Sequence, residues 1–241
     1  MTDLEHAEGH ASASTTLATE LDRHWRGTGG DSRDDALALV LLAHASAARE
    51  GHILVVGAGH GQNAIALGTA ARAGGLGRVF AVDLYPDHDD SPDSDGWSLD
   101  GLLARVVAAG LPQWVLPHYG TAATFAQLMP ADFHCRLVHV EGAHACASIE
   151  TDLYLLERLL ASGGWLTFGV GFASFPGAND AIAVFRRQRP EIVDWTWITP
   201  GLLAARKNAG PSAVTCAQEC VAVREAAGIR SNEPESARHR G

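Results

Sequence analysis

The chain has 241 residues, of which 46% are hydrophobic and 19% are charged, so its composition is that of a folded protein with one substantial core. Its formal net charge of −10 at pH 7 argues against nucleic-acid binding, because phosphates are bound by basic surfaces. The N-terminal stretch is acidic and lacks a signal peptide's apolar segment, and the longest apolar run, about 13 residues from Ala36, is too short to span a bilayer. We therefore expect a cytoplasmic protein that is not inserted in a membrane.

The two ends of the chain differ in composition from the rest. Residues 1–33 are rich in small and polar residues and predict a partly disordered arm, and residues 229–241 predict a frayed polar tail. A helix is expected to begin near Asp34 or Asp35. No linker or internal repeat interrupts residues 34–228, so we expect this range to form a single domain.

Apolar segments alternate with segments at helical spacing through this domain. Strands are predicted at residues 52–57, 78–83, 113–120, 135–142 and 165–170, and helices at 63–74, 98–110, 149–164 and 179–190. The third helix is expected to end at its two glycines. Two last runs, 193–199 and 202–207, predict an antiparallel pair at the sheet edge. The sequence therefore predicts a doubly wound α/β fold with seven mostly parallel strands and an antiparallel edge strand, in which ligands bind at the carboxyl ends of strands.

Glycines alternate with other residues where the first predicted strand gives way to a helix. Gly57, Gly59 and Gly61 suit a sharp turn that a ligand approaches closely, and Asp83 ends the next strand, where a carboxylate accepts ribose hydroxyls. The dinucleotide fingerprint requires a further glycine where this chain has Gln62, and no arginine lies near the loop to meet a pyrophosphate. The pattern favours adenosine without phosphates, as in S-adenosylmethionine (SAM). The alternative is an ordinary strand-to-helix turn.

Several motifs in order carry a resemblance to a known family. They are VVGAGHG, AVDLYP, VEGAHACASIETDL, LLASGGWLTF, FPGANDAIAVF and GLLAARK. With them the chain resembles class I SAM-dependent methyltransferases over roughly residues 34–207, in the small branch of antibiotic-tailoring O-methyltransferases and cephalosporin-hydroxylase-like proteins. The resemblance implies a Rossmann-like fold, SAM as the cofactor and a small-molecule substrate.

The resemblance also implies roles for individual residues. Gly57, Gly59 and Gly61 would line the methionine end of SAM, with Gln62 and Asn63 at a helix N-terminus that favours its carboxylate. Asp83 would hold the ribose. Leu84, Gly120, Thr121 and Ala122 would border the adenine, and Glu141 and His144 would face the transferring methyl group.

The chain departs from the family pattern in two places. The acid that usually stands two residues before the first glycine is Val55 here, which loosens the expected hold on the SAM amino group. The acidic pair after the fifth strand, which binds magnesium together with the fourth-strand acid in metal-dependent relatives, is replaced by Gly169 and Val170. With Glu141 as the remaining carboxylate, no metal is expected.

The short stretch from His139 to His144 contains two histidines and Glu141. His139 is predicted to be a core residue with a backbone partner, since it lies within the fourth strand. An imidazole suits general-base catalysis at neutral pH, so His144 is the first candidate base and His118 the second. A packing or capping role for His144 remains an open alternative.

Together these features predict a metal-independent SAM-dependent methyltransferase acting on an oxygen or nitrogen nucleophile of a small molecule. A place in secondary metabolism, such as antibiotic biosynthesis, rests on the resemblance alone. One alternative is a SAM-binding enzyme of the same fold that cyclises, eliminates or decarboxylates. Another is a catalytically silent binding protein, for which Val55 is the hint. The sequence leaves open whether the protein is a homo-oligomer.

Overall fold

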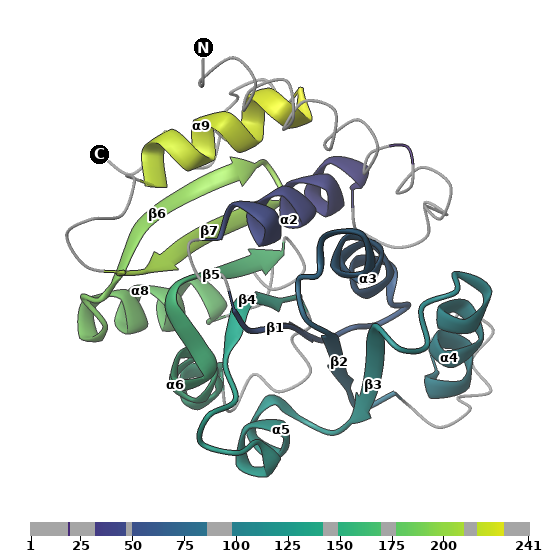
Figure 1. Cartoon of the computed structure of the whole chain (residues 1–241). Helices are drawn as coiled ribbons and strands as arrows, with labels where there is room; N and C mark the ends of the chain where they lie inside the picture. Colours follow the sequence, from purple (N-terminus) through teal and green to yellow (C-terminus); the bar gives the residue numbers. More distant parts are fainter. Residues whose placement is uncertain are drawn as a thin grey trace.

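A computed structural model describes residues 19, 32–46, 50–85, 98–141, 149–169, 177–209 and 216–228, with side chains of 216–220 excepted. A single seven-stranded sheet runs through it in the order β3-β2-β1-β4-β5-β7-β6 (Figure 1). The strands are β1 (His52–Val56), β2 (Val79–Asp83), β3 (Val115–Tyr119), β4 (Cys135–Val140), β5 (Leu160–Gly169), β6 (Ile192–Thr199) and β7 (Leu202–Lys207).

Helices cover both faces of the sheet (Figure 1). They are α2 (Arg33–Ala45), α3 (Gln62–Gly74), α4 (Leu99–Ala108), α5 (Ala122–Leu128), α6 (Ile149–Leu159), α8 (Ala178–Gln188) and α9 (Cys216–Ala227). Helices α2, α3 and α9 lie on one face, while α5, α6 and α8 lie on the other. The doubly wound α/β fold predicted from the sequence is therefore confirmed.

The side chains on the two faces of the central strands pack into two separate hydrophobic cores. Side chains alternate along a strand, so Val55 packs into the core beneath α2 and α3, whereas Leu54 packs into the core beneath α5 and α6. The first core also includes most of α2, whose residues from Ala36 to Ala43 are all buried. Such a helix is apolar on every side because it lies between α3, α9 and the sheet.

The helix predicted at residues 149–164 ends earlier than expected. Helix α6 stops at Leu159 and β5 begins at the next residue, so the two glycines expected to end the helix lie inside the strand. The Lys207 ammonium donates to the carbonyl oxygens of Glu157 (3.0 Å) and Leu160 (3.1 Å), and thereby binds carbonyls where the helix ends. The first residues of β5 form an irregular segment, because the β4–β5 register shifts between Cys135 and Leu137.

The antiparallel strand is also placed differently in detail. Strand β7 is antiparallel to both of its neighbours and lies one position inside the edge, where β6 is the last strand. The predicted pair is confirmed, but the edge strand itself runs in the same direction as β5. Helices α5 and α9 were not predicted as elements.

Within the described ranges, no helix is long and apolar enough to cross a membrane. The predicted N-terminal arm, apart from residues 19, 32 and 33, and the predicted tail lie outside the described residues.

Candidate functional site

The glycine loop between β1 and α3 is a left-handed turn. Gly57, Gly59 and Gly61 have φ angles of 77°, 50° and 79°, which disfavour residues with a side chain. A Cβ at Gly61 would lie 2.1 Å from Leu102 Cδ1, so α4 packs directly on the end of the loop. Among the described residues, a Cβ at Gly59 would meet nothing closer than the Gly57 carbonyl oxygen at 4.0 Å, so this part of the structure leaves space beside the middle of the loop.

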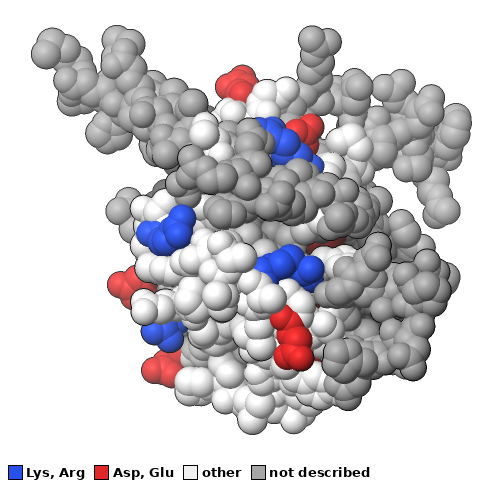
Figure 2. Space-filling model, turned by 90° about the vertical axis from the view of Figure 1, so that its right-hand side faces the viewer, with Lys and Arg blue, Asp and Glu red and all other residues white. Residues whose placement is uncertain are grey.

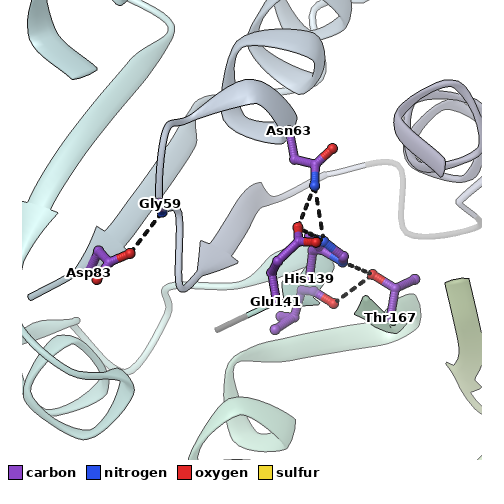
Figure 3. A network of polar contacts seen from close by, with 7 residues as sticks. Gly59, Asn63, Asp83, His139, Glu141 and Thr167 are labelled. Atoms are coloured by element: carbon purple, nitrogen blue, oxygen red, sulfur yellow. Dashed lines mark hydrogen bonds and ion pairs between the residues drawn. The ribbon is translucent and has the colours of Figure 1, made fainter. Parts of the chain in front are cut away.

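Asp83 joins the glycine loop to the end of β2. Its Oδ2 accepts from the backbone N–H of Gly59 (2.8 Å; Figure 3), and its Oδ1 accepts from the N–H of Leu84 (2.7 Å). The residue is 4% exposed, while neighbouring Leu84 is 41% exposed. Each carboxylate oxygen retains a second lone pair. Asp83 therefore fixes the loop and keeps acceptors for a further donor.

The segment after β3 lies beside Asp83. The Gly120 N–H donates to the Asp83 carbonyl oxygen (2.9 Å), and Thr121 caps α5 by accepting from Thr124 N (3.2 Å). A Cβ at Gly120 would lie 2.5 Å from Thr124 Oγ1. The structure thus brings three sequence-predicted groups together at one sheet edge: the glycine loop, Asp83 with Leu84, and Gly120 through Ala122.

Tyr85 fixes the chain after Leu84 from below. It is buried, its φ of 38° lies in the left-handed region, and its hydroxyl donates to the Ala81 carbonyl oxygen (2.7 Å). Burial raises the pKa of the Tyr85 phenol, and the negative charge of Asp83 raises it further. The neutral phenol is therefore the form that fits the fold.

A polar network follows on the α3 face, at the ends of β4 and β5 (Figure 3). Glu141 Oε2 lies 2.8 Å from His139 Nε2 and also accepts from the side-chain amide of Asn63. His139 Nδ1 lies 3.0 Å from the Thr167 hydroxyl, which is 3.3 Å from the Val138 carbonyl oxygen. His139, Thr167 and Asn63 are 1%, 0% and 4% exposed, whereas the Glu141 side chain is 19% exposed.

The prediction for His139 was correct about burial and wrong about its partner. Among the described residues, its ring nitrogens contact the side chains of Glu141, Thr167 and Asn63, not a backbone group. The alternation of residues along β4 put His139 and Glu141 on one face, but nothing local in the sequence pointed to Thr167, which lies 28 residues away.

The Glu141 carboxylate lies against Gly169 at the end of β5. A Cβ at Gly169 would lie 2.7 Å from Glu141 Oε1 and 3.1 Å from its Cδ, so the carboxylate fills the space of a side chain at 169. Among the described residues, no three His, Cys, Asp or Glu side chains are grouped as metal ligands. The described donor set around Glu141, an imidazole and an amide that both hydrogen-bond to it, does not fit a magnesium site.

Of the two candidate bases, the structure describes only His118, and it does not bring this residue together with Glu141. His118 pairs in register with Val82, packs against the ring of Phe125 at 5.2 Å, and faces the α5 side of the sheet, opposite to His139. It borders Gly120 instead, since a Cβ there would lie 3.5 Å from His118 Nε2. His144 and Val170 lie outside the described residues.

Comparison with known proteins agrees with this geometry. Residues 54–169 match the family described as a methyltransferase domain. No curated protein sequence matches the chain.

Three solved structures share the fold over most of their length. Cofactor-bound Rv0187 from MTB is 18% identical with a TM-score of 0.53, over 83% of this chain and 89% of its own. The O-methyltransferase NovP is 13% identical with a TM-score of 0.61, over 76% and 84%. TomG from Streptomyces achromogenes, an O-methyltransferase involved in tomaymycin synthesis and solved in complex with SAM, is 17% identical with a TM-score of 0.54, over 83% and 89%.

The matched range begins in β1 and ends at the last residue of β5, so it contains the glycine loop, Asp83 and Glu141. Residues 54–169 are therefore similar to a methyltransferase domain, and the chain shares its fold with the O-methyltransferases NovP and TomG.

Proposed function

We propose that the protein transfers the methyl group of SAM to an oxygen or nitrogen nucleophile of a small molecule, without a metal ion. The observation that carries the proposal is the bond from Gly59 N to Asp83 Oδ2, which holds the glycine loop and the β2 acid in one cradle. Its open side at Gly59 leaves room for a ligand against the backbone.

The proposed cofactor contacts follow from this cradle. Gly57, Gly59 and Gly61 line the methionine end, and Gln62 and Asn63 lie in the first turn of α3, where the positive end of the helix dipole favours its carboxylate. Asp83 accepts from the ribose hydroxyls. The residues proposed to border the adenine are Leu84, Gly120, Thr121 and Ala122.

SAM supplies an electrophilic methyl group on a sulfonium. In such an in-line displacement, most of the protein's contribution is to position the acceptor and keep water out. His144 is the proposed base for the acceptor's proton, with His118 as the second candidate, and a base adds about 10²- to 10⁴-fold. Replacement of His144 by Ala should lower methyl transfer by that factor at unchanged SAM affinity.

The metal-free part of the proposal rests on Gly169. Where metal-dependent relatives of the family place an acid, this chain has no side chain, and Glu141 occupies the space. Glu141 is already hydrogen-bonded by His139 and Asn63.

A small-molecule acceptor is supported by the charge of the chain. The net charge is −10, and on the face shown in Figure 2 the described acidic and basic side chains are interspersed. TomG, which shares the fold, is named for a role in tomaymycin synthesis, which supports a place in secondary metabolism.

The experiment is incubation of the protein with methyl-labelled SAM and a panel of phenols, catechols and amines. Labelled methylated product together with S-adenosylhomocysteine supports the proposal. Consumption of SAM without any methylated product would favour the non-methylating alternative, and absence of SAM binding would favour the silent binding protein.

A further inference from the structure

The carboxylate missing from β1 has a substitute on the neighbouring strand. Val55 pairs in parallel register with His139, and both are 1% exposed. Both side chains face α3, so Glu141, two residues beyond His139, points to the same side. The Glu141 N–H donates to the Val56 carbonyl oxygen (2.9 Å), which places Glu141 beside the first residue of the glycine loop.

The Glu141 carboxylate lies among three elements. Asn63 from the first turn of α3 and His139 from β4 both contact its Oε2 (Figure 3). A Cβ at Gly169, at the end of β5, would lie 2.7 Å from its Oε1. The side chain is 19% exposed, whereas His139 is 1% exposed. One end of the network is therefore accessible to a ligand and the other end is buried.

Two side chains hold the Glu141 carboxylate in place. His139 Nε2 lies 2.8 Å from Oε2, and the side-chain amide of Asn63 donates to the same oxygen. The Thr167 hydroxyl lies 3.0 Å from His139 Nδ1, on the other side of the ring. The carboxylate is thereby positioned beside the glycine loop, and a carboxylate is a good hydrogen-bond partner for a cationic group.

We infer that Glu141 is the counter-ion of the α-ammonium group of the SAM methionine, in place of the acid missing at Val55. His139 is its positioning residue, and Thr167 fixes the His139 ring. This inference rests on the proposed function, because it requires SAM to lie along the glycine loop with its methionine end near α3. It assigns no proton transfer to Glu141.

The test compares two ligands that share the adenosine and the thioether. S-adenosylhomocysteine carries the α-amino group, and 5′-methylthioadenosine lacks the whole amino-acid part. By titration calorimetry in EDTA, Glu141→Gln should weaken binding of S-adenosylhomocysteine by at least about tenfold, the usual effect of losing a charged hydrogen bond. Binding of 5′-methylthioadenosine should stay within about twofold. Glu225→Gln, an exposed change on α9, should alter neither.

Two further variants test the positioning role. His139→Leu removes the N–H and should weaken S-adenosylhomocysteine binding selectively, whereas His139→Gln keeps a donor amide and should retain much of it. Val55→Glu in the Glu141→Gln background returns a carboxylate to the family position and should recover affinity. Circular dichroism and thermal unfolding establish that each variant is folded.

Three results would overturn the inference. Equal weakening of both ligands by Glu141→Gln would mean that the residue supports the cleft and does not contact the ammonium. Unchanged affinity for S-adenosylhomocysteine would remove Glu141 from the cofactor site. Failure of the unmodified protein to bind either ligand would instead refute the proposed function, and the inference with it.

Discussion

At the level of single residues, the Asp83 carboxylate has one observed role and one proposed role. It accepts backbone N–H groups from Gly59 and Leu84, and it is the residue proposed to accept from the cofactor ribose. The same hydrogen bonds that order the loop therefore also fix the position of both carboxylate oxygens.

Asp83→Asn should therefore weaken S-adenosylhomocysteine binding by about 10- to 100-fold, because an amide has one oxygen where the carboxylate has two. Titration calorimetry measures this directly. Asp100→Asn, on an exposed position of α4, is the control and should bind as the unmodified protein does. Equal affinity of the Asp83 variant would exclude the ribose role.

Tyr85 gives a pH prediction. Its folded-state pKa is raised by burial and by Asp83, so its contribution to stability is complete below pH 10 and is lost as the pH rises above that value. Relative to Tyr85→Phe, the protein should be about 1 kcal/mol more stable at pH 8, from the bond to Ala81. That advantage should shrink by up to about 1.4 kcal/mol per pH unit above pH 10. Urea unfolding of both proteins between pH 8 and pH 11 tests it; parallel curves would contradict the assignment.

At the scale of elements, the turn into α3 depends on contact with α4. Gly61 and Gly75 flank α3, and both have positive φ angles, 79° and 63°. A Cβ at Gly75 would meet no described atom within 4 Å, whereas one at Gly61 would collide with Leu102. An alanine at Gly75 would therefore be destabilised by its backbone conformation alone, whereas an alanine at Gly61 would also clash with Leu102.

Gly75→Ala should lower the free energy of unfolding by about 1 kcal/mol, from the left-handed backbone alone. Gly61→Ala should lower the free energy of unfolding by a further 1–3 kcal/mol, roughly the effect of overpacking a core. Leu102→Ala in the Gly61→Ala background should recover less than that further loss, because it also removes a buried side chain. Chemical denaturation measures all four proteins, and equal losses at the two glycines would show that α4 yields without strain.

Helix α9 is joined to the edge of the sheet by Arg224. Its guanidinium donates to the carbonyl oxygens of Ile198 (3.3 Å) and Trp197 in β6, while Val223 beside it is buried. Arg224→Ala should therefore lower the free energy of unfolding by about 1–2 kcal/mol, and Arg224→Lys should recover part of it. If thermal unfolding of both variants matched the unmodified protein, α9 would be held by its apolar contacts alone.

For the molecule as a whole, the alternation of strands and helices could be predicted from the sequence. Parallel strands are short apolar runs, and the helices that connect them are amphipathic or apolar. What escaped the sequence was set by contacts distant along the chain. Helix α6 ends where Lys207 binds its carbonyls, and His139 is partnered by Thr167 from β5. Helix α5 is only seven residues long and carries too little periodicity to be predicted.

The candidate site divides in the same way. The glycines and Asp83 were predictable because each position demands a particular residue type at a fixed place along a strand. The proposed role of Glu141 as a counter-ion was not predictable, because Gly169 and Asn63 reach its carboxylate from other elements. The glycine at position 169 is explained by the structure, because the Glu141 carboxylate occupies the space that a side chain there would need.

Calorimetric titration of the protein with SAM, first in EDTA and then in magnesium, tests directly whether SAM binds without a metal ion. We expect binding of one SAM per chain with the same affinity in both buffers. Binding that requires magnesium would contradict the account of Glu141 and Gly169, and absence of binding in both buffers would contradict the cofactor site itself.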